Sequence, residues 1–298
     1  RPREGHVSML RSQMVAMVVA VLLVGSGCAS MESGTGGKTT LERIKSTKTI
    51  TLGYRQSSVP FSSAGADGKP SGYSIDLCTK VADDLRKDLA MPDLQVKWVP
   101  VTVENRINAV RSGTIDLECG STTNTISRQK EVDFSLTTFV TGGSLLAMRE
   151  ATQTLTDLKG LRIAVIPGTT TERTLQDAVK GAPGQVQLIP VKDHAEGRTA
   201  IETKKADAYA SDRDILIGLA LSAPDPGRFA LGDRYFSYEP YGLMLRRGDV
   251  DFRLAVNRTL ARLYRSGEVL DIYQRWFGSL GGTPALLIAT YAIEGLPE

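Results

Sequence analysis

The sequence has few histidines and cysteines, and it lacks the segments that mark common enzyme classes. Two histidines and three cysteines stand among 298 residues, and none of them is spaced like the ligands of a metal site. No G-x-S-x-G segment, the nucleophile elbow of many serine hydrolases, is present. We therefore expect no metal, no cofactor and no catalytic triad, and the sequence predicts a protein that is not an enzyme.

The chain also lacks an excess of one charge. The formal net charge is +3, and the first 27 residues contribute three arginines and one glutamate to it, so the remainder is nearly balanced. No basic stripe with interleaved aromatic residues is present, which excludes nucleic acid as a partner. With 41% hydrophobic and 23% charged residues, the composition is typical of a soluble globular protein, long enough for two ordinary domains.

No apolar run is long enough to cross a membrane comfortably. The run from Met14 to Val24 has the length of a signal-peptide core. We predict a signal peptide over residues 1–28, with translation starting at Met9, and a flexible linker over residues 29–40. Cys28 resembles a bacterial lipoprotein cleavage site, although the leucine usual three positions earlier is absent. Lipid anchorage through Cys28 and ordinary secretion both remain open.

Two cysteines, Cys78 and Cys119, remain if Cys28 is acylated. The first lies on a predicted helix and the second at the end of a predicted strand. An exported protein enters a compartment that permits disulfides, so the two residues form a candidate bridge. Two buried thiols packed as small hydrophobic side chains are the alternative.

Strands and helices are predicted to alternate in two units, an order typical of parallel sheets with crossover helices. The first unit is expected to have strands at 49–54, 94–101 and 114–118 and helices at 41–46, 73–89 and 103–112. Residues 134–148 are extended and apolar and would leave the first sheet. The second unit is expected to have strands at 161–166, 186–191 and 207–210 and helices at 172–179 and 195–204. The chain then returns with a strand at 241–246 and helices at 249–266, 268–277 and 285–295.

The predicted fold is α/β, with two Rossmann-like lobes joined by two crossing segments. We assign residues 41–140 and 240–280 to the first lobe, 141–239 to the second lobe and 281–298 to a C-terminal tail. Glycines near the crossings, at 138–143 and 238–242, are expected to absorb a hinge motion. Ligands in such sheets bind at the C-terminal ends of the strands, which here places the site in the cleft between the lobes.

Charged and hydroxyl side chains follow successive predicted strands. In the first unit Arg55, Arg106 and the segment 121–128 follow the strands, and the second unit adds Gly168-Thr169-Thr170, His194 and Asp212. Each arginine taken alone is a solvated surface charge, and the Ser/Thr/Asn cluster taken alone is an ordinary turn. Their shared position after the strands favours one site with three cations, hydroxyls and a single carboxylate.

This set of side chains fits a small zwitterion with a second carboxylate. An acidic amino acid has two carboxylates, which need charge-assisted partners when buried, and one ammonium group, which needs an anion. Each such bond typically contributes about 1.5–3 kcal/mol, and an unpaired group costs at least as much, so the pairing gives selectivity.

The stretch from Glu118 to Lys130, ECGSTTNTISRQK, resembles the ligand-binding segment of the periplasmic glutamate/aspartate-binding proteins. These are the solute receptors of ABC-type amino-acid importers, in solute-binding protein family 3. The resemblance extends from Leu41 to Phe277 and includes the motifs GYRQSSVPFS, VENRI, PGTT and KDH. It implies the fold of the type II periplasmic binding proteins.

The resemblance also implies the carboxylate partners. The residues that match the partners of the ligand α-carboxylate are Arg128, Ser121, Thr123 and Thr169. The residues that match the clamp on the side-chain carboxylate are Arg55, Arg106 and His194. Thr170 lies in the matching PGTT turn. Tyr54 stands where a histidine is also seen in this family.

The ammonium partner implied by the resemblance is Asp212, with help from Ser121. After KDH the segment EGRT is one residue shorter than the SFRT-like segment of the family. The alignment therefore leaves Asp214 open as an alternative to Asp212.

We expect a periplasmic receptor that captures glutamate or aspartate, works as a monomer and delivers its ligand to an ABC permease in the inner membrane. A receptor for a neutral polar amino acid such as glutamine is one alternative. Such a receptor would not need the clamp of Arg55 and Arg106, because its ligand has no side-chain carboxylate. A periplasmic dehydratase is the other alternative, because some dehydratases share this bilobal fold.

Overall fold

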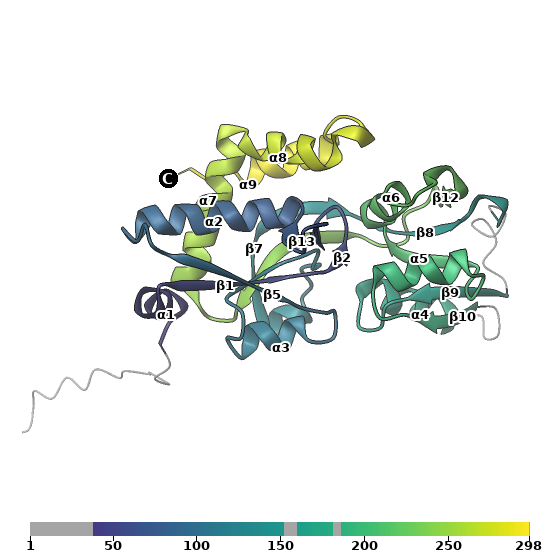
Figure 1. Ribbon diagram of the computed structural model, residues 1–298, viewed down its shortest axis with the longest axis horizontal. Helices are drawn as coiled ribbons and strands as arrows, with labels where there is room; N and C mark the ends of the chain where they lie inside the picture. The colour runs from purple at the N-terminus through teal and green to yellow at the C-terminus, as the bar shows by residue number, and fades with distance from the viewer. Residues whose placement is uncertain (1–37, 152–159, 181–185, 298) are drawn as a thin grey trace, which may run out of the picture. The chain divides into compact units, whose positions relative to one another are not determined.

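The computed structural model describes residues 38–151, 160–180 and 186–297 (Figure 1). The chain separates into residues 1–38 and a compact unit, Thr39–Glu298. The predicted signal peptide, Cys28 and nearly all of the predicted linker lie outside the described residues. The helices and strands of the described ranges all belong to the compact unit.

The first five-stranded sheet has the order β5-β1-β6-β13-β7. Its strands are β1 (Thr49–Tyr54), β5 (Gln95–Pro100), β6 (Leu117–Cys119), β7 (Val132–Thr141) and β13 (Glu239–Arg246). The first three strands of this order are parallel, whereas β13 runs antiparallel to both β6 and β7. The helices of this part are α1 (Thr40–Thr47), α2 (Tyr73–Asp88), α3 (Arg106–Arg111), α7 (Val250–Ser266), α8 (Glu268–Phe277) and α9 (Ala285–Glu294).

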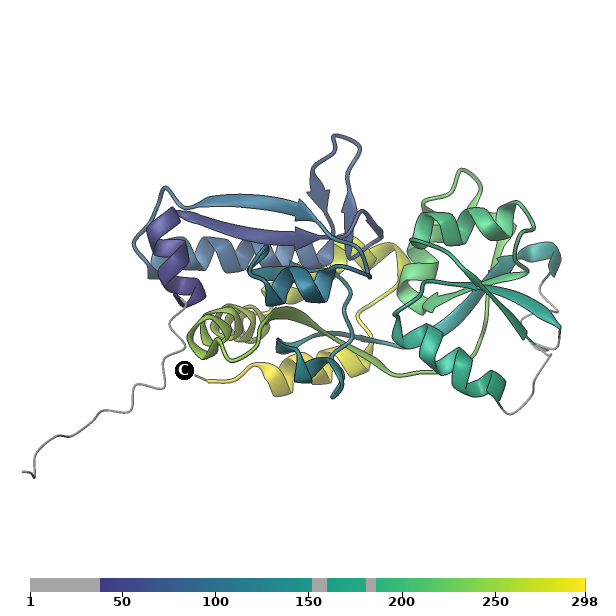
Figure 2. The same ribbon diagram turned by 90° about the horizontal axis from the view of Figure 1, so that it is seen from below.

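The second five-stranded sheet has the order β10-β9-β11-β8-β12. Its strands are β8 (Gly143–Met148), β9 (Leu161–Val165), β10 (Val186–Pro190), β11 (Ala208–Asp212) and β12 (Phe229–Leu231). Strands β10, β9 and β11 are parallel, and β8 is antiparallel to β11 and β12. Its helices are α4 (Thr170–Lys180), α5 (His194–Glu202) and α6 (Arg213–Leu221). Each sheet together with its helices forms a lobe (Figures 1 and 2).

The chain passes between the sheets through very short connections. Strand β7 ends at Thr141 and β8 begins at Gly143, so a single residue, Gly142, links the two sheets. A Cβ atom on Gly142 would lie 2.5 Å from the carbonyl oxygen of Ser237 in the returning segment, which only glycine permits. The two crossings therefore run in close contact. Strand β13 begins at Glu239, directly after the returning segment.

An aromatic cluster packs the first sheet against α2 and α8. Phe61 lies at its centre, and its ring centroid is 4.8 Å from that of Phe139 on β7 and 5.1 Å from that of Tyr241 on β13. Phe277 at the end of α8 stacks on Phe139. Such edge and stacked contacts add to the burial of apolar area. The cluster supports the strand that carries Tyr241 toward the carboxylate of Asp212.

The predicted helices and strands all occur, with shifts at their ends. Strand β6 begins at Leu117 instead of 114, and β11 extends to Asp212 instead of ending at 210. Helix α6 and strand β12 were not predicted. The α6 segment, RDILIGLAL, is almost continuously apolar and therefore shows no helical period, and β12 has only three residues. The small sheet of β2 (Ser57–Ser58), β3 (Ser62–Ala64) and β4 (Pro70–Ser71) was not among the predicted elements.

Cys78 on α2 and Cys119 at the end of β6 are joined by a disulfide in the structure, with their Cα atoms 6.1 Å apart. Both side chains are fully buried. The bridge ties α2 to β6, the strand that precedes the segment 120–130.

Removing this bridge is expected to lower the free energy of unfolding by about 4 kcal/mol, because the bridge closes a loop between residues 41 positions apart. The measurement is urea unfolding of the protein from Ala29 onward, with and without reductant, beside a Cys78→Ala/Cys119→Ala variant. The variant should be insensitive to the reductant. Equal midpoints for the wild type in both conditions would contradict the prediction.

Candidate functional site

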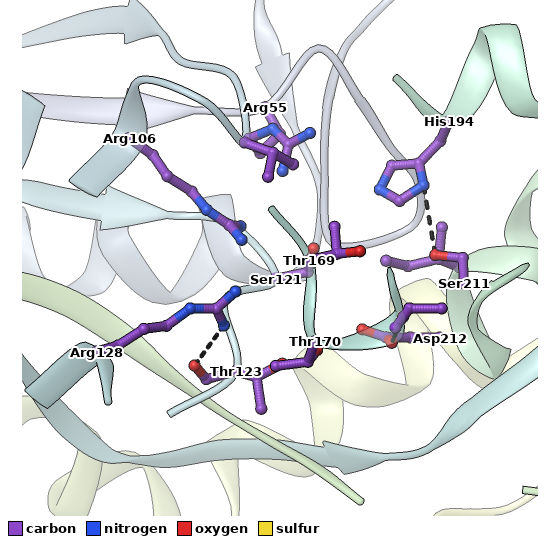
Figure 3. A pocket seen from close by; sticks show the side chains of 13 residues that line it. Arg55, Arg106, Ser121, Thr123, Arg128, Thr169, Thr170, His194, Ser211 and Asp212 are labelled. Atoms are coloured by element: carbon purple, nitrogen blue, oxygen red, sulfur yellow. Dashed lines mark hydrogen bonds between the residues drawn. The ribbon is translucent and has the colours of Figure 1, made fainter. Parts of the chain in front are cut away.

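A pocket lined by both lobes collects every ligand-binding residue that the sequence predicted (Figure 3). These residues are Arg55, Arg106, Ser121, Thr123, Arg128, Thr169, Thr170, His194 and Asp212. The lining also includes four residues that were not predicted: Val103, Thr171, Ser211 and Ile215. The ends of the parallel strands and the starts of the following helices supply most of these side chains, as expected for an open α/β sheet.

Three arginines from the first lobe point into this pocket (Figure 3). Arg55 directly follows β1, Arg106 opens α3, and Arg128 opens a short 3-10 helix, Arg128–Lys130. Arg55, Arg106 and Arg128 are only 3%, 4% and 9% exposed, respectively. Burial and the charge of Arg106 lower the pKa of Arg55 and of Arg128 to about 10, so both remain cationic at neutral pH. Three buried cations on one wall call for an anionic ligand.

The arginines differ in how far protein atoms satisfy them. Arg128 donates from Nη1 to the carbonyl oxygen of Thr123 at 2.8 Å and from Nη2 to that of Gly168 at 3.5 Å. Arg106 donates from Nη1 to the hydroxyl of Thr122 at 2.7 Å, and its buried Nε has no hydrogen-bond partner among the described residues. The Arg55 guanidinium makes no hydrogen bond to any of the described residues. Unused donors therefore remain on Arg55 and Arg106.

A buried carboxylate lies behind these arginines. Glu118, at the end of β6, is fully buried and accepts a hydrogen bond from the Thr122 hydroxyl at 2.8 Å. Because the same hydroxyl accepts from Arg106, Thr122 links the glutamate to the arginine. Glu118 opens the segment that the sequence singled out, but its charge was not assigned a role there. It offsets part of the positive charge of the site.

His194 begins α5 and faces the arginines from the second lobe (Figure 3). Its Nδ1 lies 2.6 Å from the hydroxyl oxygen of Tyr209. Burial and the nearby Arg55 and Arg106 hold the pKa of His194 well below its usual range, and burial raises the pKa of Tyr209. The histidine is therefore neutral, and its Nδ1 is hydrogen-bonded to the tyrosine hydroxyl, with the Ser211 hydroxyl 3.5 Å from the same nitrogen.

Gly197 lets α5 approach the tyrosine that orients the histidine. A Cβ atom at this position would lie 2.3 Å from Cε2 of Tyr209. Gly197 is part of the EGRT segment in which the sequence departs from the expected motif. The segment that differs from the family motif is therefore the one in which α5 packs against Tyr209. His194 nevertheless lines the pocket.

Asp212, at the end of β11, is the carboxylate of the second lobe. It accepts hydrogen bonds from the Tyr241 hydroxyl and, at 3.5 Å, from the Thr171 hydroxyl. Burial and the nearby Glu239 raise the pKa of Asp212 to about 7, against the opposing effects of Tyr241, Arg106 and Arg128. A cation in the pocket would favour its ionised form.

Asp214, the alternative that the sequence left open, lies elsewhere. Its carboxylate accepts from the Thr141 hydroxyl at 2.6 Å. It lines a different hollow, together with Phe139 and Tyr235. The structure therefore places Asp212, and not Asp214, among the residues of the predicted site.

The threonine hydroxyls of the pocket already have protein partners. Thr169 donates to the carbonyl oxygen of Ile166 at 2.7 Å. Thr123 and Thr170 donate to one carboxylate oxygen of Glu239, at 2.5 Å and 2.7 Å. Glu239 is 1% exposed and begins β13. The sequence interpretation treated the Glu239 region only as a crossing segment and missed this buried acid.

Among the described residues, no group of histidine, cysteine, aspartate and glutamate side chains is arranged to hold a metal ion. In the same residues, no helix has the length and apolar character needed to cross a membrane.

Two α/β lobes joined by paired crossings, with a polar pocket lined by both, define a type II periplasmic binding protein, as the sequence predicted. The chain belongs to the bacterial extracellular solute-binding proteins, family 3, whose profile matches residues 50–279.

Curated relatives cover most of the chain. It is 40% identical to the L-glutamate/L-aspartate-binding protein of Pseudomonas aeruginosa, over 89% of this chain and 87% of that one. It is 36% identical to the glutamate/aspartate import solute-binding protein of Salmonella typhimurium, over 89% of each chain. Among solved structures, the ancestral amino-acid-binding protein AncCDT-1, a precursor of cyclohexadienyl dehydratase, superposes with a TM-score of 0.69 at 25% identity, over 80% of this chain and all of that one.

Proposed function

We propose that this protein captures glutamate or aspartate between its lobes and delivers it to an ABC permease. The observation that carries the proposal is the set of three buried arginines, one neutral histidine and one carboxylate that line a single pocket. Relatives named for binding these two amino acids cover nearly nine-tenths of the chain. The charges of the pocket complement a zwitterion with an additional carboxylate.

Each charged group of the ligand is given partners. Arg128 binds the α-carboxylate, with Ser121 and the turn at Thr169 beside it. Arg55 and Arg106 bind the side-chain carboxylate with their unused N–H groups, and His194 adds its Nε2 proton. Asp212 binds the ammonium group. Each charge-assisted bond of this kind contributes about 1.5–3 kcal/mol.

The clamp of Arg55, Arg106 and His194 is the basis on which we propose selectivity against glutamine. All three groups donate hydrogen bonds, so they match a carboxylate, which only accepts. The amide nitrogen of glutamine is itself a donor and would face these donors without an acceptor. A site whose buried polar groups are left unpaired discriminates strongly.

Calorimetric titration of the protein from Ala29 onward with glutamate, aspartate, glutamine and lysine tests this function. We expect micromolar or tighter binding of the two acidic amino acids and much weaker binding of the other two. Tight binding of glutamine without binding of glutamate would favour the neutral amino-acid receptor. No binding of any of the four would contradict the receptor function and favour the dehydratase alternative.

A hinge between the lobes completes the proposal. We propose that the lobes rotate about Gly142 and about the returning segment before Glu239. We also propose that the protein is a periplasmic monomer exported by its amino-terminal signal, either free or anchored to lipid through Cys28. Identical small-angle scattering with and without saturating glutamate would contradict the rotation. Mass spectrometry of the protein exported from cells decides whether Cys28 is acylated.

Glutamate affinity is expected to fall as the pH is lowered from 8 to 6. With a pKa of about 7, Asp212 takes up a proton in the unliganded protein, and this proton must leave before the ammonium group can bind. Below that pKa the loss approaches about tenfold per pH unit. His194 stays neutral over this range because its pKa is held well below the usual value. The groups that face Asp212 are Tyr241, Glu239, Arg106 and Arg128.

Calorimetry at pH 6, 7 and 8 measures this dependence. An Asp212→Asn variant, which has no proton to release at this position, is the control and should bind weakly with a flatter pH profile. A wild-type affinity that is constant from pH 8 to 6 would contradict the prediction.

A further inference from the structure

Glu239 is hydrogen-bonded to two residues of the pocket lining, one from each lobe. Its Oε2 accepts hydrogen bonds from Thr123, in the loop after β6 of the first lobe, and from Thr170, the first residue of α4 in the second lobe. Its Oε1 accepts from the Ser237 hydroxyl at 2.6 Å. Ser237 in turn accepts from the backbone N–H of Gly143, 2.9 Å away, at the other crossing. One buried carboxylate thus connects both lobes and both crossings.

The bonds to Glu239 determine whether the Thr123 and Thr170 hydroxyls can donate or accept further hydrogen bonds. A hydroxyl has one proton to donate and two lone pairs with which to accept. An ionised carboxylate can only accept, so Thr123 and Thr170 must each direct their proton toward Glu239. Both threonines line the pocket, and their hydroxyl oxygens are then left with lone pairs only. A ligand group that meets them must be a donor.

We propose that Glu239 is the positioning residue of the ammonium site, because it fixes the Thr123 and Thr170 hydroxyls as acceptors beside Asp212. This inference rests on the proposed function and extends it. An ammonium group has three N–H donors, which Asp212 and the two threonine oxygens can share. Figure 3 shows Thr123, Thr170 and Asp212 on the same side of the pocket. The Glu239 charge also lies near enough to Asp212 to raise the pKa of that carboxyl.

This assignment changes the role of one predicted residue. The family resemblance implies that Thr123 helps to hold the α-carboxylate. While its only hydroxyl proton is donated to Glu239, the Thr123 side chain cannot donate to a carboxylate. Within the side chains of the pocket, recognition of that group then falls to Arg128 and Ser121.

The test compares two ligands that differ only in the ammonium group. Glutamate and glutarate have the same two carboxylates and the same carbon chain, so their affinity ratio reports recognition of the amine. In a Glu239→Gln variant the new amide can donate to a threonine oxygen and frees a threonine proton to point into the pocket. We expect at least tenfold weaker glutamate binding, with the glutarate affinity changed less than about threefold, since the carboxylate partners are untouched.

Two further variants make the test specific. Glu294→Gln is the matched control, because Glu294, on α9 of the first lobe, accepts a hydrogen bond from the backbone N–H of Thr137, outside the pocket lining. It should leave both affinities unchanged. Thr170→Val removes one of the two oriented hydroxyls, and its effect on glutamate should not add to that of Glu239→Gln, because both changes remove the same acceptor.

The outcomes separate this inference from the function on which it rests. A Glu239→Gln variant that loses affinity for glutamate and glutarate by the same factor would overturn the inference, since the residue would then support only the arrangement of the lobes. An unchanged glutamate-to-glutarate ratio with unchanged affinities would overturn it as well. Failure of the wild type to bind glutamate or aspartate would instead contradict the proposed function.

Discussion

An Arg128→Ala variant is expected to bind glutamate about 30-fold to several thousand-fold more weakly than the wild type. Removing one partner of a buried, hydrogen-bonded charge pair costs about 2–5 kcal/mol. Arg128 is 9% exposed, and its Nη2 reaches the carbonyl oxygen of Gly168, the residue before Thr169. The α-carboxylate would lose this guanidinium and the charge-assisted hydrogen bonds that we propose for it.

The measurement is calorimetry with glutamate, with thermal unfolding of the unliganded variant to show that it folds. Arg128→Lys retains the charge but loses the planar fork of donors, and it should recover only part of the affinity. Lys130→Ala in the same 3-10 helix is the control, because Lys130 is exposed and outside the pocket. Binding by Arg128→Ala within about threefold of the wild type would contradict the assignment of the α-carboxylate.

Replacing Arg55 with methionine is expected to lower glutamate affinity at least 100-fold while changing glutamine affinity much less. The guanidinium makes no hydrogen bond within the part of the chain that the structure describes, so its donors are available to the side-chain carboxylate of a ligand. Without it, that carboxylate loses a charge-assisted bond and remains buried. Methionine keeps the apolar stem of the residue and limits the loss of packing.

The readout of this second prediction is the ratio of glutamate to glutamine affinity, which should fall in Arg55→Met. Arg106→Met should shift the ratio in the same direction, with an additional loss of stability because Thr122 loses the hydrogen bond from Arg106 and the buried Glu118 loses a nearby cation. Arg111→Ala on the same helix, α3, is the matched control, since its side chain pairs with Glu131 at the surface. An unchanged ratio in Arg55→Met would mean that this arginine does not contact the ligand side chain.

The parallel parts of both sheets and the pocket residues that follow their strands could be predicted from the sequence. Strand β1 and helix α8 have the predicted ends, because TITLGY alternates regularly and Gly267 and Gly278 flank the helix. Arg55, His194 and Asp212 could be placed because each stands at the end of a strand or the start of the following helix. The ends of strands and the starts of helices can be recognised from a few neighbouring residues.

The partners of these residues could not be predicted, because they come from distant parts of the chain. Thr123 and Glu239 are 116 positions apart, and no local pattern indicates that their side chains meet. Tyr209 was predicted as part of a short strand, but its hydroxyl is hydrogen-bonded to Nδ1 of His194. Residues that hold the pocket side chains in place can be identified only from the folded structure, in which the two lobes and the returning strand meet.

The single-residue connection at Gly142 also determines how this protein is best equipped with fluorescent labels. Consecutive Cα atoms are about 3.8 Å apart, so the ends of β7 and β8 cannot slide past each other, and relative movement there is confined to a change of angle. Dyes placed on either side of this link would keep an almost constant separation. Dyes placed far from it, one on α2 and one on α4, would convert the same change of angle into a distance change that energy transfer can record.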